Sequence, residues 1–167
     1  MARKMKKIIT RKGAALEKWL DDICTQLNSM GCHAHKNHPR RSYDGFYLEG
    51  EPFDYEFFIN GQIHCFDAKE NMSGVNEWQI LHTGAIGEKI NARTMREAIN
   101  LMNCAKGGAQ SYFLVFFGNE KSDVFNKLIR FDASIIYAAM MNKETHIHYS
   151  EGQIWDLAKI INVGDRE

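Results

Sequence analysis

Apolar residues near the start of the chain recur at intervals of three and four positions. Between residues 13 and 30 they include Leu16, Leu20, Ile23 and Leu27, with Trp19 beside them. This spacing predicts an amphipathic helix. Gly31 is well placed to end it, because glycine accepts the left-handed conformation of a helix C-terminus. A polar, basic loop is expected next, with His35, Lys36, His38, Pro39, Arg40 and Arg41.

The clearest local signal is a pair of strand-like runs, 53–59 and 62–69, separated by Asn60-Gly61. Asn-Gly between such runs is a strong hairpin signal, because both turn positions need positive φ. A two-residue turn fixes the register, so that Ile59 faces Gln62 and each further pair follows outward. Asp54 is then expected directly opposite Asp67, with Lys69 on the same face as Asp67.

Helical and strand-like segments alternate over the rest of the chain. Helical spacing returns at about 88–105, with Met95, Ile99 and Met102 on one face, and Gly107-Gly108 ends it. The continuous apolar run 112–117 is typical of a strand covered on both faces, and 128–131 is a further candidate strand. Segments 134–141 and 152–161 are predicted to be helical, whereas 72–87 shows no clear pattern. This order predicts an α/β (α+β) fold with a mixed β-sheet flanked by helices.

Composition places the chain among ordinary globular proteins. The 167 residues are 44% hydrophobic and 25% charged, enough for one domain with a core. No membrane-spanning run or secretory signal is evident, so we expect an intracellular, cytoplasmic location. The four cysteines are scattered, which indicates reduced thiols and not a disulfide framework. We expect a single domain over 11–167 after a basic arm at 1–10.

The net charge is zero, but the charges are unevenly distributed. Residues 1–41 hold ten Lys and Arg against three acidic residues, whereas residues 42–167 hold eleven against eighteen. A basic end on an acidic body can follow the phosphates of a nucleic acid. A disordered, solubilising tail explains residues 1–10 equally well.

The expected pairing of Asp54 with Asp67 needs a chemical reason. Directly opposed residues have Cβ atoms about 4.5–5.5 Å apart, where like charges are destabilising. A bound divalent cation compensates, since Mg²⁺ favours one or two carboxylates plus waters and substrate phosphate. Lys69 can then orient a water or stabilise developing negative charge, and Glu56 is a further candidate ligand. Solvated charges on an exposed edge hairpin are the alternative interpretation.

Four blocks of sequence resemble the PD-(D/E)XK nuclease superfamily, and most closely its RecU-type Holliday junction resolvases. These are Arg11-Lys12-Gly13 through Leu16-Glu17, Pro52-Phe53-Asp54-Tyr55, Phe66-Asp67-Ala68-Lys69-Glu70, and Gly107-Gly108 with the strand 112–117. They span about residues 11–117, and the last fifty residues match weakly.

The resemblance implies a restriction-endonuclease-like fold and a homodimer that nicks four-way DNA junctions with Mg²⁺ or Mn²⁺. It implies Asp54, Asp67 and the Ala68 carbonyl as metal ligands, Lys69 as the catalytic lysine and Glu17 as a catalytic acid. Two features depart from the family. The insertion before the first acidic strand is shortened to about 40–51, and Thr94-Met95-Arg96 stands where a later helix of the family carries a His-Gln pair.

Several basic residues are candidates for DNA contact. They are Arg11, Lys12, Lys36, Arg40, Arg41, Lys89, Arg93 and Arg96. Lys89, Arg93, Arg96 and Asn100 are spaced to form one polar helix face, which either lines phosphates or is simply solvated.

Other groups of residues allow weaker interpretations. Cys32, His33, His35 and His38 lack the spacing of common zinc sites. Tyr43, Phe46 and Tyr47 either stack on unpaired bases or pack on the core. His146 and His148 are expected on one side of a short strand.

The sequence thus predicts a Mg²⁺-dependent endonuclease for branched DNA. Alternatives are a related nuclease acting on flaps, nicked or linear duplex, and a non-catalytic DNA-binding module on the same fold.

Overall fold

The structure is a computed structural model that describes residues 14–37 and 53–162. The helices are α1 (Ala14–Ser29), α2 (Ala92–Lys106), α3 (Ala133–Met141) and α4 (Leu157–Asn162), with a short 3₁₀ helix at Tyr149–Glu151. The strands are β1 (His33–Lys36), β2 (Tyr55–Ile59), β3 (Gln62–Asn71), β4 (Glu77–Gln79), β5 (His82–Thr83), β6 (Lys89–Ile90), β7 (Gln110–Phe117), β8 (Lys127–Asp132), β9 (His146–His148) and β10 (Gln153–Ile154).

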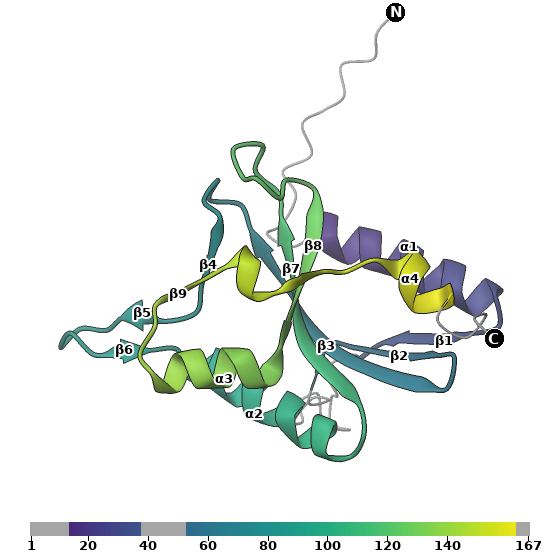
Figure 1. Ribbon diagram of the computed structural model, residues 1–167, viewed down its shortest axis with the longest axis horizontal. Coiled ribbons are helices and arrows are strands. Elements are labelled where there is room, and N and C mark those ends of the chain that lie inside the picture. Colours follow the sequence, from purple (N-terminus) through teal and green to yellow (C-terminus); the bar gives the residue numbers. More distant parts are fainter. Residues whose placement is uncertain (1–13, 38–52, 163–167) are drawn as a thin grey trace, which may run out of the picture.

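Six strands form one sheet in the order β1-β2-β3-β7-β8-β10 (Figure 1). β3 and β7 run parallel, and the other neighbouring pairs are antiparallel. Two small two-stranded sheets, β4–β9 and β5–β6, lie beside it. The predicted mixed sheet flanked by helices is confirmed.

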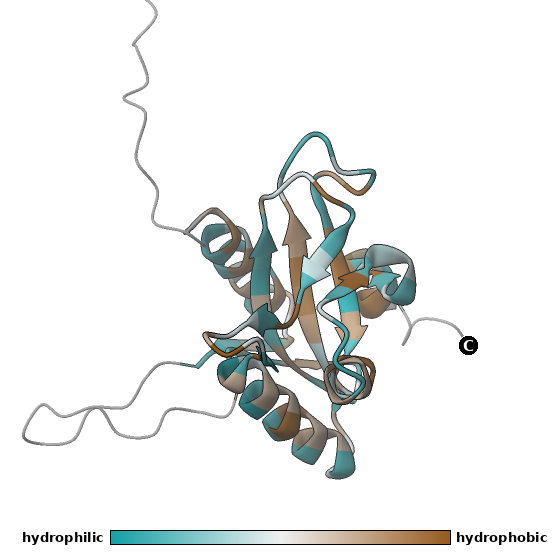
Figure 2. Ribbon diagram, turned by 90° about the vertical axis from the view of Figure 1, so that its left-hand side faces the viewer, coloured by the Kyte–Doolittle hydropathy of each residue, from teal (hydrophilic) through white to brown (hydrophobic). Residues whose placement is uncertain are grey.

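The two faces of the sheet are covered by different helices. α1 and α4 pack on one face over Phe57, Phe66 and Leu114, and α2 and α3 pack on the other over Phe113 and Val115. Residues alternate between the faces along a strand, so β7 contributes to both halves of the core and is buried almost throughout. In Figure 2 a largely brown, hydrophobic strand accordingly runs through the middle of the sheet, beside strands with teal, hydrophilic stretches.

The β2–β3 hairpin has the predicted register. Ile59 pairs with Gln62, Phe58 with Ile63, and Tyr55 with Phe66. Asn60 and Gly61 have φ of 52° and 74°, the positive values that a tight hairpin turn requires. Asp54 therefore enters β2 beside Asp67, as expected.

Two predicted boundaries are wrong. The segment after α1 is not only a loop: residues 33–36 form β1, which pairs with β2. Its single buried side chain, Ala34, gave little sign of a strand. The predicted helix over 152–161 is an edge strand, β10, followed by the short helix α4.

The second helix begins later than predicted and buries a different face. It starts at Ala92 with Asn91 as its N-cap, so Lys89 lies in β6 and not on the helix. Thr94, Ala98 and Leu101 are its buried residues, whereas Ile99 is 44% exposed. Met95 and Met102 of the predicted stripe are partly buried and do pack against the core, so the buried face is shifted from the predicted one and leaves out Ile99. None of the described helices is long and apolar enough to cross a membrane.

Candidate functional site

Asp54 and Asp67 are linked to each other at the point where β2 begins. The backbone N–H of Asp54 donates to Asp67 Oδ1 at 2.9 Å, and the N–H of Ala68 donates to Asp54 Oδ2 at 3.2 Å. Asp67 is buried at 2% exposure, whereas Asp54 is accessible. The expected meeting of these two carboxyl groups is therefore present.

Lys69 lies on the same face of β3 and is held by a helix residue. Its Nζ donates to Glu97 Oε1 at 2.8 Å and to Oε2 at 2.9 Å. Both side chains are largely covered, at 21% and 15% exposure. Arg93, one turn earlier on α2, is 3.9 Å from the same carboxylate. One ammonium and three carboxyl groups thus gather between β3 and α2.

The pKa values of both aspartates are raised. Partial desolvation raises the pKa of Asp54, and the charge of Glu97 adds to it. Burial raises the pKa of Asp67, followed by the charges of Asp54 and Glu97. A single ammonium group does not compensate this much negative charge in a desolvated place. Such a group of perturbed acids is typical of a functional site.

Asp67 also has an unused oxygen. Its Oδ2 is buried and has no hydrogen-bond partner among the described residues, although buried polar atoms are nearly always paired. An unpaired carboxylate oxygen beside a second carboxyl group fits the hard, oxygen-preferring ions Mg²⁺ and Mn²⁺. No cluster of three or more His, Cys, Asp and Glu side chains suited to a metal occurs in 14–37 and 53–162, so the protein ligands available here are two carboxylates and backbone.

Asp54 and Lys69 open onto a cleft of about 1000 Å³, and the buried Asp67 lies behind them. The lining of the cleft comes from α1, the strands β1 to β5, β9 and the start of α2. It includes Glu17, Lys36, Asp54, Ala68, Lys69, Trp78, His82, Asn91, Arg93 and His146. The volume is far larger than one ion requires, so a bulky substrate can approach the carboxylates.

Glu17 and Lys36 lie at the α1 side of this cleft. Lys36 Nζ is 3.7 Å from Glu17 Oε2 and 5.9 Å from the centre of the Tyr55 ring. The N-terminus of α1 is fastened to β3, because the N–H of Leu16 donates to Glu70 Oε1 at 3.2 Å. Glu17 therefore faces the cleft as expected, paired with a lysine that is itself a candidate for DNA contact.

The other residues predicted to contact DNA or metal lie in different places, and only some of them line the cleft. Arg93 lines the cleft and its side chain is 80% exposed. Arg96 is exposed on α2, and Lys89 donates to Thr83 Oγ1 within the β5–β6 hairpin. The four-residue stripe predicted for one helix is therefore wrong. Glu56 pairs with Cys65 across the hairpin as predicted, but it is not among the described residues that line the cleft.

Several predictions fall outside the described residues. These concern Arg11, Lys12, His38, Arg40, Arg41, Tyr43, Phe46, Tyr47 and the basic arm 1–10. Two of the histidine predictions can be followed: His146 and His148 lie on one side of β9, with Ile147 buried on the other.

Sequence reasoning missed Glu97. It is the only acidic residue in α2, a signal that gains meaning only once the helix is known to cross beside Lys69. The spacing of 28 residues between them carries no periodic pattern that would reveal the contact.

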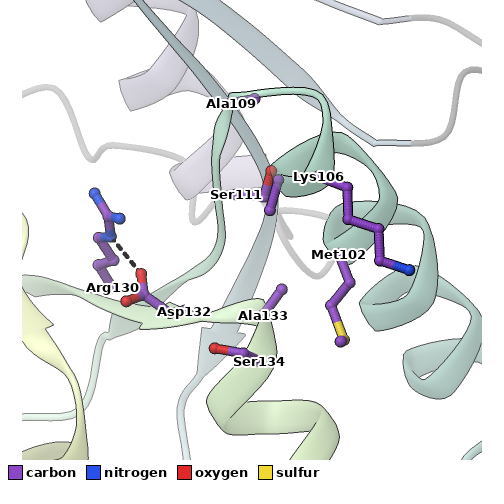
Figure 3. A pocket seen from close by; sticks show the side chains of 9 residues that line it. Met102, Lys106, Ala109, Ser111, Arg130, Asp132, Ala133 and Ser134 are labelled. Carbon is purple, nitrogen blue, oxygen red and sulfur yellow. Dashed lines mark hydrogen bonds and ion pairs between the residues drawn. The ribbon is translucent and has the colours of Figure 1, made fainter.

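A second, smaller pocket of about 450 Å³ lies at the end of α2, lined by Lys106, Ser111, Arg130 and Ser134 among others (Figure 3). Arg130 Nε donates to Asp132 Oδ1 at 2.8 Å, and its Nη1 donates to Gln110 Oε1. The one guanidinium of this pocket is thus engaged with protein groups.

Comparison with known proteins finds likeness among solved structures. No protein-family model matches the chain, and no curated protein matches its sequence. Among solved structures, the chain is similar to Hjc of Archaeoglobus fulgidus, a Holliday junction resolvase from an archaeal hyperthermophile, with 15% sequence identity and a TM-score of 0.48. The alignment covers 89% of this chain and 98% of that chain. The RecU-type resemblance stays a prediction.

Proposed function

We propose that this chain is a divalent-metal-dependent DNA endonuclease whose preferred substrate is a four-way junction. One observation carries the proposal. Two linked carboxyl groups, one buried with an unpaired oxygen, lie with a lysine on the same sheet face at a large cleft. Without a cation this arrangement is destabilising, so its presence indicates a site kept for function.

The proposed roles follow from the residue types. Asp54, Asp67 and the Ala68 carbonyl are the candidate ligands for Mg²⁺ or Mn²⁺, which when bound would acidify a water and neutralise phosphoryl charge. Lys69 would orient the attacking water or stabilise charge that develops on the phosphate. Glu97 would keep that ammonium in place. A rigid central strand holds these groups in register, as in-line attack requires.

The proposed DNA contacts come from basic residues around the cleft. Lys36 and Arg93 line it, and Arg96 lies on the same helix as Arg93. The sequence adds four more candidates for DNA contact, Arg11, Lys12, Arg40 and Arg41. A homodimer is also proposed, because paired nicks across a junction need two active sites; it rests on the resemblance to RecU-type resolvases.

A second candidate within the same chemistry is a nuclease for flaps, nicked or linear duplex. The same carboxylates and lysine support it, because cleavage chemistry does not specify the shape of the DNA. A non-catalytic DNA-binding module is the candidate from another class. The unpaired Asp67 oxygen speaks against it, because a surface that only binds phosphates gains nothing from buried acids.

The deciding experiment is cleavage of a synthetic four-way junction and a matched linear duplex, with Mg²⁺ or with EDTA. Symmetric, metal-dependent nicking of the junction alone supports the proposal. Equal cutting of the duplex supports the second candidate. Binding with no cutting under any metal condition supports the third.

Two variants test the assigned residues. Asp67→Ala and Lys69→Ala should each abolish cleavage while junction binding, followed by fluorescence anisotropy, survives. Lys121→Ala is a matched control, since this lysine is exposed in the loop before β8 and should leave cleavage unchanged. Undiminished cutting by either site variant would remove that residue from the mechanism.

A further inference from the structure

The β5–β6 hairpin presents the most exposed large hydrophobic side chain of the described residues. Ile86 at its tip is 90% exposed, followed by Ile154 at 60%. His82 pairs with Ile90 and Thr83 with Lys89, and the hairpin projects away from the central sheet (Figure 1). An apolar side chain held out in this way does not contribute to the core.

The tip is ordered by its own hydrogen bonds. Glu88 Oε2 accepts from the N–H of Ile86 at 3.0 Å, and the Glu88 carbonyl accepts from the N–H of Gly84 at 2.7 Å. A Cβ at Gly84 would lie 2.1 Å from Glu88 Oε1, so only glycine leaves the carboxylate in this position. Gly87 adopts a φ of 84°. The backbone is therefore arranged in advance to hold Ile86 outward.

The base of the hairpin borders the cleft that contains Asp54 and Lys69. His82, the first residue of β5, and Asn91, which follows β6, both line that cleft. Asn91 joins the hairpin to its surroundings, because its side chain donates to the Ile80 carbonyl at 3.1 Å and accepts from the N–H of Thr94. A polymer bound along the cleft would therefore lie next to the base of this hairpin.

We propose that the β5–β6 hairpin is a wedge that inserts Ile86 between stacked bases of the DNA beside the cut site. The inference rests on the proposed function and adds a way of opening the substrate. Proteins that unstack a base step do so with a single apolar side chain such as isoleucine, while basic residues hold the nearby phosphates. Ile86 has this character, and Lys89 and Arg93 supply the charge on either side of Asn91.

The neighbourhood of Ile86 favours DNA over a protein partner. Ile86 is the one large apolar side chain of the turn, where its neighbours are Gly84, Ala85, Gly87 and Glu88, and the next exposed apolar side chain of the hairpin is Ile90 on β6, at 49%. A stable protein interface needs a broad patch of roughly 800 Å² on each partner. A single apolar side chain suits insertion between two stacked bases, because the gap between them admits one side chain.

The test is 2-aminopurine fluorescence in a four-way junction with the probe at the branch point. It is measured in EDTA with enough protein for anisotropy to show saturation. Wild-type protein should raise the fluorescence several-fold, because the probe loses its stacking. Ile86→Ser should remove most of that rise at full occupancy. Ile135→Ser is the matched control, an isoleucine 37% exposed on α3, and should behave as wild type.

A second variant and a rescue make the test specific. Gly84→Ala keeps Ile86 but displaces Glu88, so it should lower the fluorescence rise partially. A junction with a mismatch at the branch point is already unstacked, so Ile86→Ser should cut it at nearly the wild-type rate while cutting the matched junction more slowly.

An unchanged fluorescence rise with Ile86→Ser would overturn the wedge. A second contrary result is that Ile86→Ser changes the molar mass measured by light scattering but leaves the fluorescence rise per bound protein unaltered. The hairpin would then contact a second protein copy. Failure of wild-type protein to cut or bind any DNA would instead overturn the proposed function itself, which separates the two outcomes.

Discussion

Lys69 Nζ on β3 and the Glu97 carboxylate on α2 are joined by two hydrogen bonds, of 2.8 and 2.9 Å. The ammonium group is thereby directed to the helix and fixed beside Asp67 without forming its main ion pair there. The Lys69 side chain is long and flexible, and a two-point contact of this kind restricts its ammonium group to one position.

Replacing Glu97 should therefore impair cleavage without preventing DNA binding. Glu97→Gln keeps the size of the side chain but removes the charge that holds Lys69. We expect the single-turnover cleavage rate to fall about 10- to 100-fold, the range usual for residues that orient a catalytic group. Glu120→Gln, in an exposed loop, is the matched control. A rate within twofold of wild type in Glu97→Gln would show that Lys69 needs no such support.

Asp67→Asn should make the metal-free protein more stable. Burial and the charges of Asp54 and Glu97 raise the pKa of Asp67, so its ionised form opposes folding at neutral pH. The amide keeps an oxygen to accept from Asp54 and carries no charge. We expect the free energy of unfolding in EDTA at pH 7 to rise by about 1–2 kcal/mol, while cleavage is lost.

The pH dependence of this gain follows from the sign of the shift. A carboxyl group whose pKa is higher in the folded state weakens folding above its unfolded pKa of about 3.9. The advantage of Asp67→Asn should therefore disappear as the pH falls below about 4, where both forms are neutral. Urea unfolding across this range measures it, with the exposed Asp22→Asn as control. A loss of stability at pH 7 would contradict the raised pKa.

His64 should make the fold sensitive to mild acid. Burial, and secondarily the charge of Arg130, lower its pKa from 6.5 to about 4. Between these values the unfolded chain binds a proton that the folded protein excludes, so stability falls as the pH drops. The contribution lost at pH 5 is about 2 kcal/mol.

His64→Gln tests this by removing the titrating group while leaving an acceptor for the Tyr112 hydroxyl, which lies 3.1 Å from His64 Nδ1. Its stability should change less between pH 7 and pH 5 than that of wild type, whatever the absolute value at pH 7. His33→Gln alters an exposed histidine of β1 and should leave the wild-type difference in place. Equal pH dependence of stability in all three proteins would show that His64 is not the source of the acid sensitivity.

Arg93 and Arg96 should contribute to DNA affinity through charge. Each phosphate contact that is lost lowers the slope of log affinity against log salt by about 1. We expect Arg93→Gln and Arg96→Gln each to weaken junction binding and to flatten this slope, with cleavage at saturating protein retained. Lys127→Gln, exposed on β8, serves as the control. An unaltered slope in both variants would assign these arginines to the solvated face of α2.

The hairpin with its two carboxyl groups could be predicted because its information is local. Asn60-Gly61 sets the turn, the turn sets the register, and the register brings Asp54 to Asp67. The apolar run of β7 could also be predicted, because a strand covered on both faces has few polar positions. The predicted homodimer, metal and junction preference rest on resemblance and stay predictions.

The remaining parts depend on contacts that no local pattern records. β1 is polar on its exposed side and is a strand because β2 offers it an edge. The face that α2 buries includes Thr94 and Ala98 and leaves Ile99 exposed, which the apolar spacing of the helix does not indicate. Glu97 gains its role from the path of the chain between β3 and α2, and the short strands β4 to β6 that make this path were not visible in the sequence.

Trp155 has a consequence for how the molecule is assembled. Its indole N–H donates to the Tyr112 hydroxyl at 3.0 Å, and its ring packs near Phe57 and Phe66, beside the strand that carries Asp67. During synthesis the first 150 residues can pair their strands, but this half of the core stays open until Trp155 emerges from the ribosome. The nascent chain should therefore acquire a rigid support for its acidic residues only after Trp155 has left the ribosome.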